Sequence, residues 1–245
     1  MSENVIKQSP KPNNWQIAQV SNIIGISFLA MFVPAFFGEF VVRNGMIDWN
    51  NATQTFQNIS SGTVKFELGI LAFMIVLLLD IVVATAFYQL VKKQNQSLAL
   101  LMTFFRIVHI CIKGGGMVGL LMARNTVVNA SKGEIIQHAS ATVLQYLEWH
   151  HIAFGIGLFF FGIHLILFAK LLFNTEWMAK WVAVLVFASG IGFSLNSLAQ
   201  FFMEDVAWLV NGILLILILP MTFAELIVGL WLMAKRKKLK NQVVL

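Results

Sequence analysis

The stretch LLLDIVVATAFYQLVKKQNQSLALLMTFFRIVH, residues Leu77–His109, contains the features that decide the fold. Two apolar runs flank the short polar segment 92–97, and each belongs to a run of more than 20 mostly apolar residues. A helix of about 20 such residues crosses roughly 30 Å of hydrocarbon. The stretch therefore predicts two membrane-spanning helices joined by a tight turn, with Asp80 in the first and Arg106 in the second.

The composition of the whole chain agrees with a membrane protein. Of its 245 residues, 58% are hydrophobic and only 11% are charged. Soluble domains carry roughly 25% charged residues, because polar side chains must cover much of their surface. This composition excludes a soluble enzyme, a disordered protein and a nucleic-acid-binding domain.

Further apolar runs on both sides of this stretch predict an all-α, polytopic bundle of six transmembrane helices. The runs are continuous rather than alternating, which excludes the strands of a membrane barrel. The polar segments 43–65 and 123–149 are predicted to be long loops on the outer face, whereas 92–97, 174–178 and 201–207 are tight connections. The predicted spans are Val20–Val42, Phe66–Val91, Leu98–Met122, His150–Phe173, Ala179–Gln200 and Trp208–Met233.

Positive charges predict the orientation of these spans. Cytoplasmic loops of membrane proteins are enriched in Lys and Arg. The side that holds both termini carries eleven of the seventeen Lys and Arg residues, the other side carries four, and two lie inside a span. We therefore expect an inner-membrane protein with a cytoplasmic N-terminal segment, 1–19, a transmembrane domain, 20–233, and a basic cytoplasmic tail, 234–245. Six of the seven tryptophans lie near predicted span ends, where aromatic belts occur.

Six polar side chains deep within the predicted spans are the candidate ligand- or ion-binding residues. Ionisable groups in hydrocarbon are costly and usually face the interior of a helix bundle. At 1.5 Å per residue, all but Lys113 fall about 12–16 Å from the cytoplasmic ends of their spans, in one layer. The candidates are Asp80, Arg106, His109, Lys113, His164 and Glu225.

The pattern of these residues leaves two interpretations open. Arg106, His109 and Lys113 are spaced three and four apart, so they lie on one helix face. Asp80, Arg106, Lys113 and Glu225 sum to zero charge, as a structural network that fixes helix pairing would require. Histidine and carboxylate at one depth are also the usual components of a proton relay.

Cofactor and metal sites are less strongly indicated. His109 and His164 lie at similar depth on consecutive spans, which is the minimum for a bis-histidine haem. No haem motif accompanies them, so we expect no cofactor. Glu148 and His151 have the spacing of a carboxylate-bridged metal site, but we expect no metal and interpret these residues and His150 as solvated groups at the membrane interface.

The glycine run Gly114–Gly116 also has two interpretations. Gly115 and Gly119 form a small-xxx-small pair, which lets a second helix approach closely. Alternatively, the run loosens the helix, so that backbone N–H groups and Lys113 face a cavity suited to an anion.

Three stretches together resemble a known family. They are Leu77–His109, GLFFFGIHLILFAKLL (Gly157–Leu172) and AELIVGLWLMAK (Ala224–Lys235). Their order and spacing are similar to those of the bacterial membrane-protein family catalogued as domain of unknown function 4386, over most of the chain from Val20 onward. The resemblance implies a hydrophobic helical protein of the bacterial inner membrane and no particular activity.

The sequence thus favours a membrane protein whose polar layer binds or transports a small solute, a proton or a lipid-like molecule. The alternative is a structural or partner-binding protein, homo-oligomeric or bound to another membrane protein, in which the layer only specifies packing. An enzyme is less favoured, because no nucleophile–base pair is evident.

Overall fold

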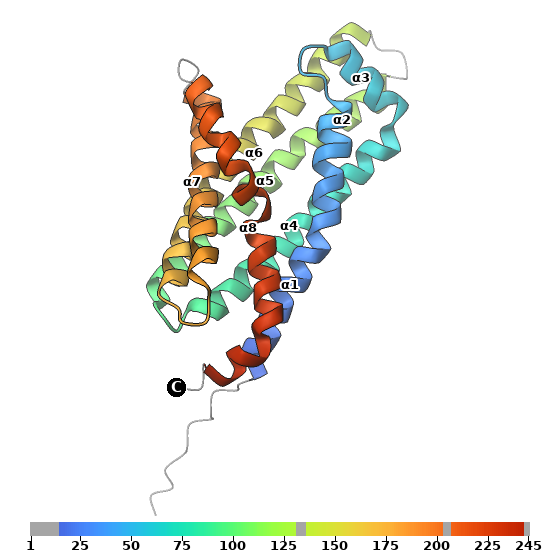
Figure 1. Cartoon of the computed structure of the whole chain (residues 1–245). Helices are drawn as coiled ribbons and strands as arrows, with labels where there is room; N and C mark the ends of the chain where they lie inside the picture. The colour runs from blue at the N-terminus through green and yellow to red at the C-terminus, as the bar shows by residue number, and fades with distance from the viewer. Residues whose placement is uncertain (1–14, 131–135, 203–206, 243–245) are drawn as a thin grey trace, which may run out of the picture.

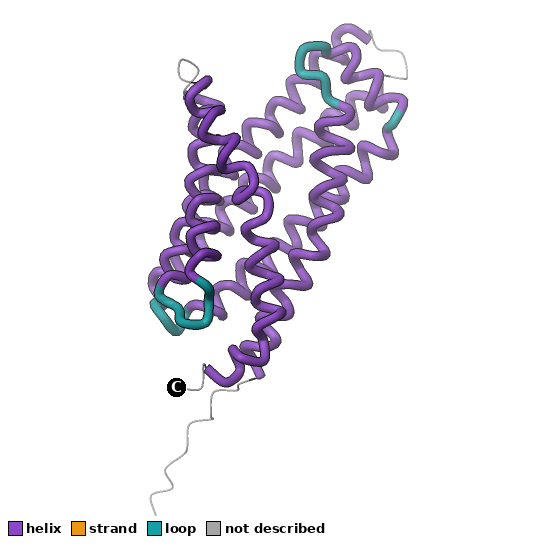
Figure 2. The backbone as a smooth tube through the Cα atoms, viewed as in Figure 1, coloured by secondary structure: helices purple, strands orange, loops and turns teal. Residues whose placement is uncertain are grey.

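The computed structural model describes residues 15–130, 136–202 and 207–242, and all regular elements in these ranges are helices. Long helices dominate the architecture, and short connections link them (Figures 1 and 2). In chain order the elements are α1 (Trp15–Phe36), the π-helix η1 (Phe37–Arg43), α2 (Asn44–Met46), α3 (Ala52–Ser61), α4 (Thr63–Val91), α5 (Gln96–Ala130), α6 (Ile136–Phe173), α7 (Lys180–Phe202) and α8 (Ala207–Gln242).

The six long helices form a closed ring. From α4 to α7, each helix packs against the next helix along the chain, so that α7 packs against α8, and α1 packs against both α4 and α8. The contact between α1 and α8 joins the first helix to the last and closes the ring. The turn between α4 and α5, the turn between α6 and α7 and the end of α8 all lie at one end of the molecule, and α3 lies at the other (Figure 1).

The described residues contain five helices that are long and apolar enough to cross a membrane. They are Ala18–Met46, Thr63–Val91, Gln96–Ala130, Ile136–Phe173 and Lys180–Phe202. The sixth predicted span, Trp208–Met233, falls within α8, where many side chains lie outside the described residues. Residues 1–14 of the N-terminal segment and part of the basic tail also lie outside the described residues.

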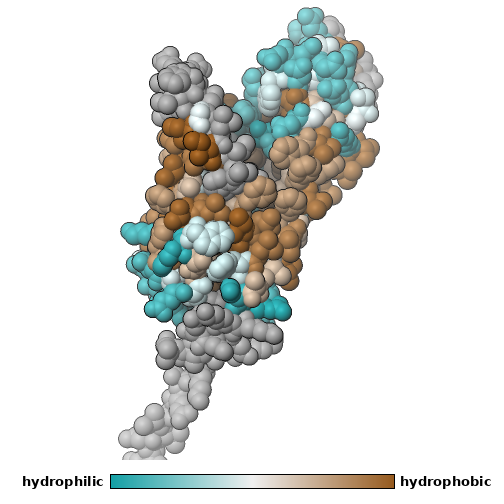
Figure 3. All heavy atoms as spheres, in the orientation of Figure 1, coloured by the Kyte–Doolittle hydropathy of each residue, from teal (hydrophilic) through white to brown (hydrophobic). Residues whose placement is uncertain are grey.

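Large apolar side chains are exposed along the middle of the molecule, and hydrophilic residues gather towards the ends (Figure 3). This distribution is that of a protein surrounded by lipid.

The two segments predicted to be outer loops are largely helical, so the prediction that they are loops was wrong, and their placement on the outer face stays a prediction. Segment 43–65 contains α3, and segment 123–149 is occupied by the last two turns of α5 and the first four of α6. These helix ends pack against α3 through apolar residues that include Phe56, Val127 and Val143. A hydropathy run marks the part of a helix suited to hydrocarbon, and it does not mark where the helix ends.

The interior has two apolar clusters, one towards each end of the ring. The cluster nearer the termini includes Phe28, Phe87 and Phe168, and the other includes Phe66, Met117 and Leu147. The buried polar side chains at the level of Arg106 and His109 lie where these two clusters meet.

Glycines allow the helices to approach closely. A Cβ atom on Gly162 of α6 would lie 2.6 Å from the carbonyl oxygen of Gly190 on α7, and one on Gly119 of α5 would lie 2.4 Å from the carbonyl oxygen of Tyr146 on α6. The predicted close pair was only half right: Gly116 accompanies Gly119 at the α5–α6 contact, whereas a Cβ atom on Gly115 would have no neighbour within 4 Å. Helix α5 is continuous through the run, so the loosened-helix interpretation was wrong.

The α6–α7 crossing generates a first prediction. Gly162→Ala should destabilise the protein by about 1–3 kcal/mol, because the new methyl group overpacks a backbone contact. Gly115→Ala, a matched control in open space, should be neutral or stabilising by up to about 1 kcal/mol, since alanine favours helix. Thermal unfolding in detergent measures both. Equal effects of the two substitutions would contradict the close crossing.

Candidate functional site

The guanidinium of Arg106 is the centre of the candidate site. Arg106 is on α5, and its side chain is completely buried. Its Nε donates to Asp80 Oδ1 at 3.0 Å, its Nη1 contacts Glu225 Oε1 and His164 Nε2, and its Nη2 contacts Asp80 and Glu225. The five N–H groups of an arginine are thereby all directed at acceptors. The partners come from α4, α6 and α8, so one side chain links four helices of the ring.

Two carboxylates share this single guanidinium unequally. Asp80 accepts from both Nε and Nη2, and both nitrogens contact the same oxygen, Oδ1. Glu225 receives one short contact from Nη1 and a longer one of 3.4 Å from Nη2, and its side chain is 21% exposed against 9% for Asp80. With both carboxyl groups ionised, the trio carries a net charge of −1.

His164 is held as a neutral ring. Its Nε2 lies 3.0 Å from Arg106 Nη1, and its Nδ1 lies 2.9 Å from the carbonyl oxygen of Met102. An arginine only donates and a carbonyl only accepts, so Nε2 is the acceptor and Nδ1 carries the proton. The ring also stacks against two aromatic side chains, with centroids 6.3 Å from Phe87 and 6.1 Å from Phe168.

His109 has one nitrogen fixed and one directed at a carboxylate. Its Nδ1 donates to the carbonyl oxygen of Gly157 at 2.7 Å. Its Nε2 lies 3.7 Å from Asp80 Oδ2, which is within ion-pair distance but too long for a direct hydrogen bond. A proton on Nε2 would turn this approach into a charged pair. We refer to Arg106, Asp80, Glu225, His164 and His109 as the Arg106 cluster.

The structure brings five of the six predicted site residues together and places the sixth nearby. Lys113, one turn beyond His109 on α5, forms no ion pair within 4 Å in the described ranges. Its Nζ lies 4.2 Å from the centre of the Phe154 ring, a cation–π contact, and it interacts electrostatically with Asp80. The sequence predicted that the charges of four residues balance. In the structure Asp80, Arg106 and Glu225 are in direct contact, and the fourth charge, on Lys113, acts over a longer distance.

A second polar group, near the end away from the termini, was missed by the sequence prediction. Arg43 pairs with Glu39 at 3.4 Å within η1, and its Nη2 lies 3.4 Å from His151 Nδ1 on α6. His151 in turn contacts Gln200 on α7 at 2.6 Å. Glu39 lies inside the predicted span Val20–Val42, and its i, i+4 spacing to Arg43 was a usable signal. Short π-helical segments are frequent at functional sites.

The interfacial histidines also differ from the prediction. His150 is buried, with only 3% of its surface exposed, and His151 is half-buried, whereas Glu148 is exposed as expected. The prediction failed for His150 because α5 and α6 continue as a packed pair beyond the apolar run and enclose it.

A bis-histidine haem would require the rings of His109 and His164 to bind one iron. Both nitrogens of His164 and Nδ1 of His109 are engaged by protein groups, so an iron would have to displace Arg106 or a backbone carbonyl to bind both rings. The expectation of no cofactor and no metal stays a prediction.

These observations define a class: a membrane-type protein, helical throughout its described elements, in which a buried arginine links two carboxylates and one histidine and a second histidine faces one of the carboxylates. The family model of Domain of unknown function (DUF4386) matches residues 23–235, and the chain belongs to that family. An uncharacterized protein from Archaeoglobus fulgidus is 25% identical over 174 residues, which cover 71% of this chain and 87% of the relative. Relatives of this kind therefore occur in an archaeon, beyond the bacteria that the resemblance implied. No solved structure matches the chain.

The Arg106 cluster generates a second prediction. Arg106→Gln should destabilise the protein by about 3–5 kcal/mol, because it leaves two carboxylates buried without their cation. The loss should shrink at acidic pH, where the carboxyl groups can take up protons and lose their charge. Thermal unfolding across a pH series measures this.

The matched control is Arg124→Gln, which removes the corresponding partner of Glu67 from an ion pair that is about one-third exposed on each side. Exposed pairs contribute about 0–1 kcal/mol, so this variant should be close to wild type. An Arg106→Gln protein as stable as the Arg124→Gln protein at neutral pH would contradict the central role of Arg106.

Proposed function

We propose that this protein is a six-span integral membrane protein with both termini on the cytoplasmic side, and that its Arg106 cluster binds an exchangeable proton as part of proton-linked movement of a small solute. The observation that carries the proposal is the pair of carboxylates that contact one guanidinium, a largely buried trio with a net charge of −1 to which Lys113 adds only a longer-range positive charge. A buried group with uncompensated charge favours uptake of a proton over full ionisation.

Glu225 is the proposed proton carrier. Asp80 is held by two nitrogens of Arg106 and faced by His109, so it is the better stabilised carboxylate. Glu225 is more exposed and has the longer second contact. Protonation of Glu225 leaves Arg106 and Asp80 as a neutral pair. It also weakens the attraction between Glu225 on α8 and Arg106 on α5. Uptake of the proton can therefore change how α8 packs in the ring of helices.

The competing proposal is a purely structural role, and a specific observation favours it. All five N–H groups of Arg106 have acceptors, as expected of a network that fixes helix register. The two proposals differ in whether the cluster exchanges a proton in the folded protein.

Infrared difference spectroscopy of the protein in lipid nanodiscs tests this difference. A pH change should produce the C=O band of a protonated carboxyl group in a dry environment, and Glu225→Gln should remove it. Glu67→Gln, which alters an ion-paired glutamate at the partly exposed Arg124 contact, should leave the band unchanged. If folded wild-type protein gives no such band at any pH, the structural role is the better account. A band lost in Asp80→Asn and kept in Glu225→Gln would assign the proton to Asp80.

The proposed topology has its own test. In a Cys111→Ser background, which removes the only cysteine, Ser61→Cys places a thiol in α3 and Gln94→Cys places one in the α4–α5 turn. Both positions are exposed, and α3 and the α4–α5 turn lie at opposite ends of the molecule (Figure 1). A membrane-impermeant thiol reagent should label Ser61→Cys in intact cells and Gln94→Cys only after the membrane is opened. The reverse pattern would invert the orientation.

A further inference from the structure

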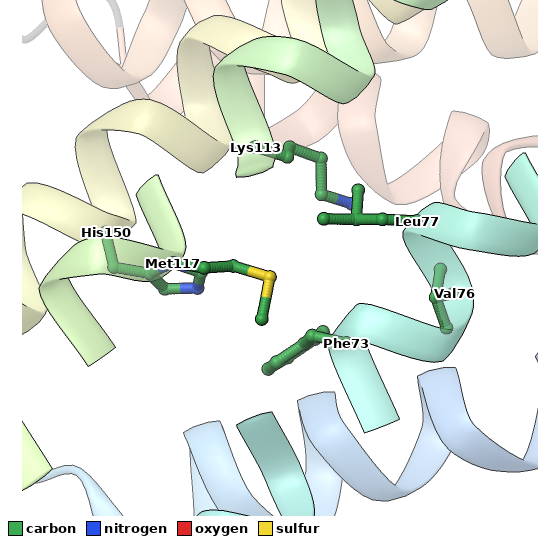
Figure 4. Close-up of a pocket in the computed structure, with 6 residues that line it drawn as sticks. All are labelled: Phe73, Val76, Leu77, Lys113, Met117 and His150. Carbon is green, nitrogen blue, oxygen red and sulfur yellow. The ribbon is translucent and has the colours of Figure 1, made fainter. Parts of the chain in front are cut away.

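A small cavity lies on the same face of α5 as the Arg106 cluster, further from the termini. It has a volume of about 10 Å³ and is lined by Phe73, Val76, Leu77, Lys113, Met117 and His150. That volume accommodates the centre of about one water molecule. Figure 4 shows the cavity between α4 on one side and α5 and α6 on the other. Its walls are almost entirely apolar, and Lys113 and His150 are the two lining residues that carry side-chain nitrogen atoms.

His150 is a buried polar group without a normal partner. Its Nδ1 faces the backbone of Gly116, but neither ring nitrogen reaches a hydrogen-bond partner of normal geometry in the described structure. A buried polar group of this kind is usually satisfied by an ordered water. Lys113 makes only its ring contact with Phe154 and long-range electrostatic contacts, so a water in the cavity would also give its ammonium group an acceptor.

Lys113 at the cavity and His109 in the Arg106 cluster pack against the same glycine. A Cβ atom on Gly157 of α6 would lie 3.0 Å from Lys113 Cγ and 3.4 Å from His109 Nδ1, so both side chains pack on this residue. His109 then approaches Asp80 at 3.7 Å. The polar groups therefore follow one another from His150 through Lys113 and His109 to Asp80. The charged and titratable groups that face this route from the surrounding helices are Asp80 on α4, Glu39 and Arg43 on η1, Arg106 on α5 and His151 on α6.

We infer that the cavity between Lys113 and His150 holds water and is the port through which the Arg106 cluster exchanges its proton with the side of the membrane away from the termini. The inference rests on the proposed function, because it supplies the route for the proton assigned to Glu225. In each step a proton moves between water and a nitrogen or oxygen atom along the route, and no other bond is made or broken. The last step passes the proton from Asp80 to Glu225, which both contact Nη2 of Arg106.

Hydrogen–deuterium exchange at the protonated carboxyl group tests the port. Transfer of the protein in nanodiscs from H₂O to D₂O at constant acidity shifts the infrared C=O band, at a rate set by the access of water to the cluster. His150→Phe removes the unpartnered ring nitrogens beside the cavity, and Leu77→Phe fills the cavity. Both should slow the shift at least tenfold and leave the equilibrium size of the band unchanged.

Two matched controls make the comparison specific. Leu78→Phe is the same substitution at the next residue, where the side chain is 64% exposed, and His138→Phe removes an exposed histidine. Both controls should exchange at the wild-type rate. A wild-type protein with no carboxyl band would overturn the proposed function itself. A normal band with wild-type exchange rates in His150→Phe and Leu77→Phe would overturn the port alone.

A measurement on the unmodified protein covers the case in which either variant fails to fold. With ¹⁵N-labelled histidine, water-edited nuclear magnetic resonance should transfer magnetisation from water to the ring nitrogens of His150. Those of His164, which are both bonded to protein groups, should receive none. A dry His150 ring would overturn the inference.

Discussion

The neutralisation of charge at Arg106 is the constraint on which the other features depend. An isolated guanidinium within hydrocarbon is costly, and its five donors need acceptors in fixed directions. Asp80, Glu225 and His164 supply them from three different helices. The helices can come close enough because glycines occupy the crossings, as at Gly162 and Gly190. The small residues at the helix contacts therefore allow the buried charges in the interior to reach their partners.

The membrane character and the layer of polar groups could be predicted from the sequence, because both depend on position along single helices. Uniform helix rise placed Asp80, Arg106, His164 and Glu225 at one depth, and the structure brings these four together. Depth alone cannot give the direction in which a side chain points around its helix. The unequal sharing of Arg106 between its two carboxylates therefore required the structure.

The features that the sequence did not predict have two physical causes, a core at the helix ends and a π-helix. Helices α5 and α6 continue past their apolar runs because Phe56, Val127 and Val143 form a core of the kind found in soluble proteins, which hydropathy does not distinguish from a loop. That continuation encloses His150, which the sequence assigned to solvent. The polar contacts of Arg43 arise from η1, and a π-helix has no simple sequence signal.

The closure of the ring by α1 and α8 has a consequence for biogenesis. Ribosomal synthesis runs from α1 towards α8, so Asp80 and Arg106 enter the membrane together as a hairpin joined by a tight turn and can pair at once. Glu225 follows 119 residues after Arg106. Glu225, the second carboxylate, and α8, the helix that closes the ring, consequently enter the membrane in the same step. Until α8 is in place, the guanidinium of Arg106 lacks its contact with Glu225. This missing contact distinguishes an incomplete chain from a finished one within the bilayer.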